Sequence, residues 1–307
     1  KVLKKLELLG VSLFRINLSH TETKDLERII DHIRKITQVP ICIDTEGAQI
    51  RTRLKKKTFL NEGQLIKIFF NLDENINSIN FYPKESINQF KVGDLVFIDF
   101  NSVVVEVVKV EKTFIQIVVI NEGSILSNKG VAINKPIKLS AFTQKDINSI
   151  KIAKDKKITN FALSFCNCTD DLKKLRKMIP SGSNVIAKIE NRIGFSNCKE
   201  ICKSADAVLI DRGDLSKEYN IEDIPIIQKK ITKIAKLEKT KIFVATNFLE
   251  SMIENPFPNR AEINDIYNTL IDGVDGLVLA AETAIGKYPV ESASVLKRIF
   301  ANLKTSF

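Results

Sequence analysis

The chain has 307 residues, enough for one large domain with an insertion or for two domains, and its 44% hydrophobic and 27% charged content excludes an intrinsically disordered protein. Its formal net charge of +10 comes with no nucleic-acid-binding motif, so we expect anionic small molecules and no nucleic acid as partners. With five cysteines, no signal peptide and no apolar run near the roughly 18 residues that span a membrane, we expect reduced thiols, a cytoplasmic location and no membrane partner.

Short apolar runs alternate with amphipathic patterns along most of the chain. After an opening amphipathic helix, the predicted strands cover residues 12–17, 40–44, 159–165, 184–189, 207–210, 241–245 and 276–280. The predicted helices cover residues 24–36, 146–153, 170–178, 195–202, 225–237, 262–271 and 290–303. Continuous apolar strands between helices are typical of a parallel sheet that is buried on both faces. We therefore predict an α/β fold, a (β/α)₈ barrel of the TIM type.

Residues 53–138 break this rhythm, because they contain Val- and Ile-rich runs bounded by Gly, Asn and Asp and no long helical pattern. We predict an inserted all-β domain there and assign residues 1–52 and 139–307 to the parallel α/β barrel. Seven barrel strands are predicted, one fewer than the eight that close such a barrel. Either a first strand precedes this sequence or the barrel is incomplete.

The carboxyl ends of the predicted strands carry an unusual set of polar residues. In an α/β barrel these ends meet at one mouth, where catalytic groups gather. Here they supply hard oxygen ligands and two cations: Asp44, Glu190, Asp214, Arg15 and Lys188. Carboxylates with few soft ligands suit Mg²⁺ or Mn²⁺, and Arg and Lys beside such a metal suit a phosphoryl group in transfer. The residues therefore predict phosphate chemistry with a divalent metal.

Several motifs at these positions resemble those of the pyruvate kinase family, in the same order over nearly the whole chain. Arg15-Ile-Asn-Leu-Ser-His20 resembles R-x-N-F-S-H, and Asp44-Thr-Glu-Gly-Ala-Gln-Ile-Arg-Thr52 resembles D-T-K-G-P-E-I-R-T. Lys188-Ile-Glu-Asn191 matches K-I-E-N, Arg212-Gly-Asp-Leu215 matches R-G-D-L, and Ala245-Thr-Asn-Phe-Leu-Glu-Ser-Met252 resembles A-T-Q-M-L-E-S-M. The resemblance implies the family's catalytic barrel with an inserted β-barrel lid domain, and a chain without its C-terminal regulatory domain.

The resemblance also implies a reaction and its ligands. The reaction is that of glycolysis, in which phosphate moves between phosphoenolpyruvate, or a close analogue, and ADP, with pyruvate and ATP as the other pair. The implied metal ligands are Glu190 and Asp214 for Mg²⁺ or Mn²⁺, and Asn17, Ser19, Asp44 and Thr45 for K⁺. Gln49, beside the K⁺ site, replaces a Glu of the family pattern, so K⁺ dependence stays open.

The same resemblance implies roles for the remaining polar residues. The implied catalytic residues are Lys188, Thr246, Arg15 and Glu282. The implied substrate ligands are Gly213, Asp214, Thr246 and Lys188. The implied nucleotide ligands are Arg15, His20, Arg51 and Lys129, and Lys129 lies on the lid. For His20, an ordinary loop histidine is an equal alternative.

Two further departures keep other functions open. Asp211 replaces a small residue and places a carboxylate near an anionic ligand, where like charges weaken binding or favour a different substrate. Ala280 replaces a Ser and removes a hydroxyl from the region of proton delivery. One alternative is a similar barrel that binds phosphoenolpyruvate, nucleotide or a protein partner without turnover. Another is a metal-dependent barrel enzyme for a different enolpyruvate-type acid. Whether the chain forms a homo-oligomer is also open.

Overall fold

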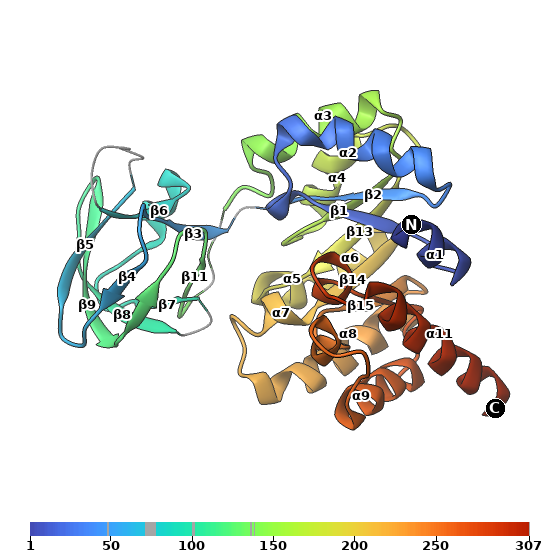
Figure 1. Ribbon diagram of the computed structural model, residues 1–307. Coiled ribbons are helices and arrows are strands. Elements are labelled where there is room, and N and C mark those ends of the chain that lie inside the picture. Colours follow the sequence, from blue (N-terminus) through green and yellow to red (C-terminus); the bar gives the residue numbers. More distant parts are fainter. Residues whose placement is uncertain (48, 71–77, 100–101, 136, 138, 307) are drawn as a thin grey trace. The chain divides into compact units, whose positions relative to one another are not determined.

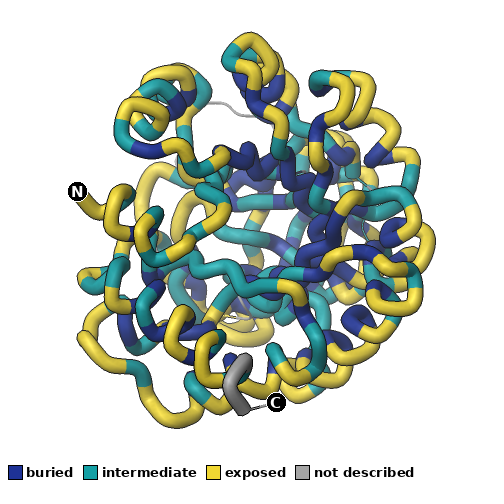
Figure 2. The backbone as a smooth tube through the Cα atoms, turned by 90° about the vertical axis from the view of Figure 1, so that its right-hand side faces the viewer, coloured by how far each residue is buried: buried dark blue, intermediate teal, exposed yellow. Residues whose placement is uncertain are grey.

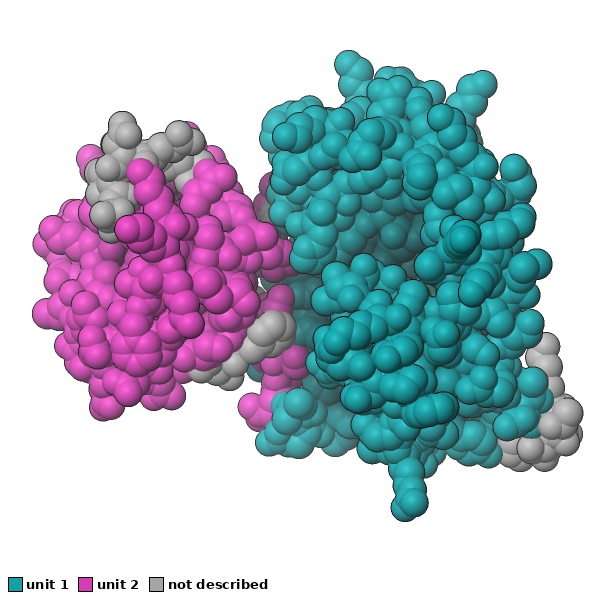
Figure 3. Space-filling model, in the orientation of Figure 1, with its two compact units in different colours: residues 1–47, 141–215, 221–307 teal, residues 48–140, 216–220 magenta. Residues whose placement is uncertain are grey.

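The computed structural model describes residues 1–47, 49–70, 78–99, 102–135, 137 and 139–306. The chain forms two compact units, coloured separately in Figure 3. Unit 1 comprises Lys1–Gly47, Ala141–Leu215 and Ile221–Phe307, and unit 2 comprises Ala48–Ser140 and Ser216–Asn220. Among the residues described, no helix has the length and apolar character needed to cross a membrane.

Unit 1 is built on a curled parallel sheet of seven strands in the order β1-β2-β12-β13-β14-β15-β16 (Figure 1). The strands are β1 (Phe14–Asn17), β2 (Ile41–Asp44), β12 (Asn160–Leu163), β13 (Asn184–Ile189), β14 (Ala207–Asp211), β15 (Lys241–Ala245) and β16 (Gly276–Val278). All four residues of β2 and all five of β14 are buried, as expected for strands covered on both faces. The predicted α/β fold is confirmed.

Helices precede, connect and follow the strands of this sheet. They are α1 (Val2–Leu8), α2 (Thr23–Ile36), α3 (Gln144–Asp155), α4 (Thr169–Met178), α5 (Arg192–Ser196), α6 (Cys198–Ser204), α7 (Arg212–Leu215), α8 (Ile224–Leu237), α9 (Arg260–Ile271), α10 (Ala281–Ala284) and α11 (Pro289–Ser306). Helix α2 shows their common pattern, because Leu26 and Ile30, four residues apart, are buried on one face. In Figure 2, buried stretches of backbone lie in the middle of the view and exposed ones surround them.

One predicted helix is wrong. The pattern over residues 195–202 predicted a single helix, whereas the structure has α5 and α6, separated at Asn197. Asn197 has φ −98° and ψ 10°, and its side-chain amide donates to the carbonyl of Asn167 at 2.8 Å. This contact comes from a segment 30 residues earlier in the chain, so the helical periodicity carries no sign of it.

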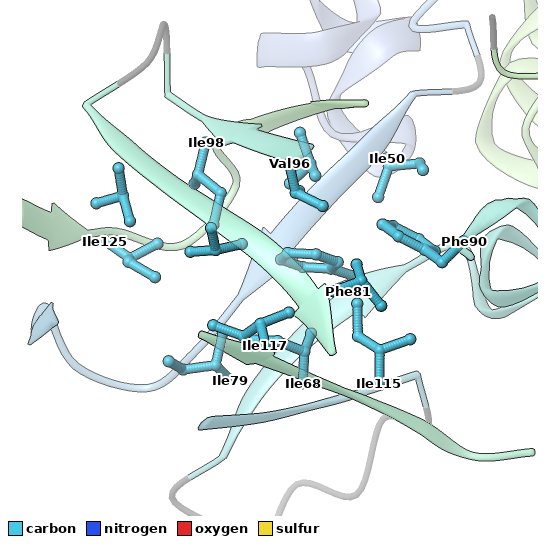
Figure 4. Close-up of a cluster of buried hydrophobic side chains, with 14 of the residues drawn as sticks. Ile50, Ile68, Ile79, Phe81, Phe90, Val96, Ile98, Ile115, Ile117 and Ile125 are labelled. Carbon is cyan, nitrogen blue, oxygen red and sulfur yellow. The ribbon is translucent and has the colours of Figure 1, made fainter. Parts of the chain in front are cut away.

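Unit 2 is a closed antiparallel-rich barrel of seven strands in the order β11-β3-β6-β5-β9-β8-β7. Its strands are β3 (Ile50–Arg53), β5 (Leu65–Phe69), β6 (Ile79–Tyr82), β7 (Leu95–Ile98), β8 (Val103–Val110), β9 (Phe114–Asn121) and β11 (Gly130–Ile133), with β4 (Thr58–Leu60) and β10 (Gly123–Ile125) as a separate pair. Alternate residues of β8 and β9 point inward, and Figure 4 shows the aliphatic and aromatic cluster that they help to form. The predicted all-β insertion is present.

Asp146 anchors the segment of unit 1 that follows β2. Its buried carboxylate accepts hydrogen bonds from the backbone N–H groups of Glu46 at 2.7 Å, Gly47 at 3.2 Å and Thr143 at 3.0 Å. Gly47 has φ +70°, and a Cβ there would lie 2.8 Å from a ring carbon of Phe165, so this position requires glycine. Asp146 therefore fixes the backbone on both sides of the inserted residues.

Candidate functional site

The candidate site lies at the carboxyl ends of the unit 1 strands. Parallel pairing sets Asn17 of β1 beside Asp44 of β2, so polar residues at these ends become neighbours. Lys188 lies in β13 and Glu190 directly follows this strand, two residues further on, so both side chains project to the same side. The register thus gathers residues that are far apart in the sequence at one edge.

Lys188 is the centre of the cluster and is only 4% exposed. Its Nζ lies 2.8 Å from Glu190, 3.3 Å from Asp44 and 3.8 Å from Asp211. It also donates to the hydroxyl of Ser164 at 3.0 Å. Burial lowers the pKa of Lys188, but the three carboxylates outweigh it and raise that pKa above its ordinary value. The ammonium group is therefore held charged inside the protein.

Arg15 supplies a second cation at the same place. Its guanidinium donates to Asp44 at 2.7 Å, and Asp44 is fully buried. Burial lowers the pKa of Arg15, whereas Asp44 and Asp211 raise it, with a net upward shift. Asp44 is thus shared between two cations. Burying three charged groups together costs desolvation free energy, which suggests that the arrangement is kept for a ligand or a reaction.

The residues predicted to bind K⁺ are near one another in sequence and in the sheet register. The Oδ1 of Asn17 accepts from the N–H of Ser19 at 2.9 Å, and the Oγ of Thr45 accepts from the N–H of Ser164 at 2.9 Å. In these contacts the side-chain oxygens orient the local backbone. Their role in K⁺ binding stays a prediction.

Three carboxylates converge beside Lys188. One oxygen from each of Glu190, Asp211 and Asp214 lies within 4.8 Å of the others. Burial raises the pKa of Glu190 to about 8; Lys188 opposes that shift, and the negative charges of Asp214 and Asp211 add to it.

The contacts of Glu190 show whether the site suits a metal ion. Its Oε2 accepts from the N–H of Phe165 at 2.6 Å, while its buried Oε1 is in an ion pair with Lys188 but makes no hydrogen bond within the described ranges. A buried carboxylate oxygen with unused acceptor capacity next to two further carboxylates suits a hard divalent cation. The residues present fit Mg²⁺ or Mn²⁺.

Thr246 connects the carboxylates to the next strand. Its hydroxyl donates to Asp211 at 2.6 Å, and the N–H of Gly213 lies 3.5 Å from the same hydroxyl oxygen. Thr246 also has φ +79°, which is unusual for a β-branched residue and stores backbone strain. Such strain persists only where the surroundings hold it, as they often do at functional sites.

Arg212 and Glu282 hold the segment that contains Thr246. Arg212 donates to the carbonyl of Thr246 at 3.1 Å, forms a two-pronged ion pair with Asp265 at 2.7 and 3.0 Å, and lies over the ring of Phe248. Glu282 is buried and accepts from the N–H groups of Leu249 at 3.0 Å and Ala280 at 2.8 Å. In this structure, therefore, both oxygens of Glu282 position backbone. Its predicted catalytic role stays a prediction.

The predicted nucleotide ligands fall in both units. Arg15 is in the cluster of unit 1, and His20 is exposed at the end of a 3-10 turn (Leu18–His20). In unit 2, Arg51 of β3 pairs in register with Gly130 of β11 and donates to the carbonyl of Asn128 at 3.2 Å. Lys129 forms an ion pair with Asp99 at 2.9 Å. Binding of nucleotide by these residues stays a prediction.

Ser164 and Arg212 were missed as members of the site. Ser164 directly follows β12 and contacts Lys188. Asp44 and Glu190 were selected for a similar place at a strand end, so the same criterion could have found Ser164. Arg212 precedes the Gly-Asp pair of a recognised motif, but its contact with Asp265 joins residues 53 positions apart. No local sequence pattern predicts that contact.

Comparison with known proteins gives a consistent result. The family described as "Pyruvate kinase, barrel domain" matches residues 1–293. A pyruvate kinase of Thermotoga maritima is 36% identical over 97% of this chain and 67% of its own length. Pyruvate kinases of Chlamydia muridarum and Methanocaldococcus jannaschii are 32% and 36% identical, over 100% and 93% of this chain and 66% and 63% of their own lengths. The chain thus spans about two thirds of the length of these curated relatives.

Proposed function

Because this chain belongs to the pyruvate kinase family, we propose that it moves a phosphoryl group between phosphoenolpyruvate and ADP, the reaction of that family in glycolysis. The observation that carries the proposal is Lys188, a buried cation ringed by Asp44, Glu190 and Asp211 at the carboxyl ends of the strands. A charged group so deeply buried costs free energy of several kcal/mol, and preorganised charge is what phosphoryl transfer requires.

In the direction of ATP synthesis, the bond between the enol oxygen and phosphorus breaks as a bond forms from phosphorus to an oxygen of the ADP β-phosphate. The enolate left behind takes up a proton at its terminal carbon and becomes pyruvate. Negative charge therefore moves across the phosphoryl group and then onto the enolate oxygen. Lys188 is suited to neutralise both, because neighbouring carboxylates hold it in its charged form.

The other residues bind, orient and supply charge. Arg15, fixed by Asp44, would bind phosphate oxygens. Glu190 and Asp214 would hold the divalent cation, which supplies Lewis-acid polarisation and neutralises phosphate charge when bound. Thr246 would lie at the face where the enolate is protonated, and the N–H groups of Gly213 and Asp214, on α7, would bind the substrate carboxylate.

The test is a coupled assay of the full chain with phosphoenolpyruvate, ADP and Mg²⁺ or Mn²⁺, with and without K⁺. We expect turnover that Lys188→Met lowers by at least about 100-fold, the loss typical of removing one transition-state charge partner. Lys173→Met is the matched control, because Lys173 pairs with Asp170 on the surface, 71% exposed. A wild-type chain without turnover, or a Lys188→Met variant as active as the wild type, would contradict the proposal.

A further inference from the structure

In the proposed function, Asp211 serves only as the most distant of the three carboxylates around Lys188. It ends β14, is buried, and lies between the hydroxyl of Thr246 at 2.6 Å and the ammonium of Lys188 at 3.8 Å. Lys188 already has closer carboxylate partners in Glu190 and Asp44. Asp211 is therefore the weakest of the three charge partners of Lys188.

The charge of the cluster points to a further cation. It contains two positive side chains, Arg15 and Lys188, and four carboxylates, Asp44, Glu190, Asp211 and Asp214. Carboxylates crowded together at buried positions oppose one another's charge. A divalent cation bound among them would offset that repulsion, and the carboxylate of Asp211 would add one negative charge to attract it.

The spacing of the carboxylates suits such an ion. The ligand oxygens of Glu190, Asp211 and Asp214 lie within 4.8 Å of one another. Oxygens on opposite sides of Mg²⁺ are about 4.2 Å apart, and those on opposite sides of Ca²⁺ are about 4.6–5.2 Å apart. Glu190 also has a buried oxygen, Oε1, which pairs with Lys188 and forms no hydrogen bond among the described residues. The three donors are thus close enough for one hard divalent cation to bind them together.

Building on the proposed function, we propose that Asp211 is a third carboxylate ligand of the divalent-cation site, so that this chain binds the cation through three of its own carboxylates before substrate arrives. The hydrogen bond from Thr246 fixes the rotamer of Asp211, which prepares it for coordination. The alternative is that Asp211 serves only as the acceptor for Thr246.

The experiment titrates the full chain with Mn²⁺ alone, without phosphoenolpyruvate or nucleotide. Binding is followed by calorimetry or by the electron paramagnetic resonance signal of free Mn²⁺. Asp211→Asn keeps the size of the side chain and an acceptor for Thr246 but removes the charge. We expect it to weaken Mn²⁺ binding at least tenfold, since even residues that only orient metal ligands are worth about 10–100-fold in affinity. Asp211→Ala should weaken binding in the same direction, and a thermal melt establishes that each variant is folded.

Two comparisons decide the outcome. Asp170→Asn removes one surface carboxylate of the same unit and should leave Mn²⁺ affinity within about twofold, since exposed charges are well screened. Unchanged affinity in both Asp211 variants, or a wild-type chain that does not bind Mn²⁺ without substrate, would overturn the inference. If the chain turns over in the coupled assay but shows one of these two outcomes, only the role of Asp211 is refuted. Binding that depends on Asp211, in a chain without turnover, would instead refute the proposed reaction alone.

Discussion

Both units bury apolar side chains, but only unit 1 also buries a cluster of charged ones. The barrel of unit 2 encloses aliphatic and aromatic side chains such as Phe81, Ile68 and Val105, each of them fully buried. At the carboxyl ends of its strands, unit 1 instead buries Lys188, Asp44 and Glu190, whose stability depends on mutual pairing. Close packing stabilises unit 2. The charged cluster of unit 1 costs desolvation free energy, so packing alone does not explain why it is buried.

The largest expected effect lies in the packed interior of unit 2. The ring of Phe81 contacts Phe70 and Phe90, with centroids 6.0 Å apart in each pair. We expect Phe81→Ala to lower the free energy of unfolding of unit 2 by about 3–5 kcal/mol, because it removes a large side chain and leaves a cavity. Chemical denaturation of the full chain measures it.

Phe59→Ala is the control, since Phe59 of β4 is 53% exposed and its loss should change stability little. Equal destabilisation by the two substitutions would contradict the view that packing dominates unit 2.

A smaller effect is expected at Asp146, one of the carboxylates that unit 1 buries outside the cluster. Asp146→Ala leaves the N–H groups of Glu46, Gly47 and Thr143 without their acceptor. Each unsatisfied buried donor costs about 1–3 kcal/mol. Gly47 is buried, whereas Glu46 and Thr143 are half-buried, so we expect unit 1 to lose about that much stability. Thermal unfolding measures it, with Asp155→Ala at the end of α3 as the control. A loss no greater than in that control would show that water satisfies these donors.

A further expected effect concerns pH, and it should distinguish the two units. Burial raises the pKa of Glu190 from 4.5 to about 8. Between these values the unfolded chain has released this proton while the folded chain retains it, so metal-free unit 1 should lose stability as the pH rises from 4.5 to about 8 and then level off.

Melting temperatures across this pH range, in the presence of a chelator, test the expectation. Glu190→Gln should flatten the slope, whereas Glu62→Gln, an exposed position in unit 2, should leave it as in the wild type. A wild-type slope retained in Glu190→Gln would assign the pH response to other groups.

The sequence predicted most of the fold because its signals are local. Continuous apolar runs marked the strands, and their alternation with amphipathic patterns marked the parallel sheet. The same reasoning placed Arg15, Asp44, Lys188 and Glu190 at strand ends, and the structure brings these four together. The failure at residues 195–202 came from Asn197, whose contact with Asn167 overrides helical periodicity.

Periodicity and strand-end position are properties of neighbouring residues, so the sequence alone was enough to specify most of the elements and the types of group that would meet. Which groups pair depends on strand register and on side-chain rotamers in the assembled sheet. Asp211 shows the difference: its sequence position predicted only a crowded negative charge. Folding sets it between Thr246 and Lys188, within reach of Glu190 and Asp214, because β14 lies between β13 and β15 in the sheet.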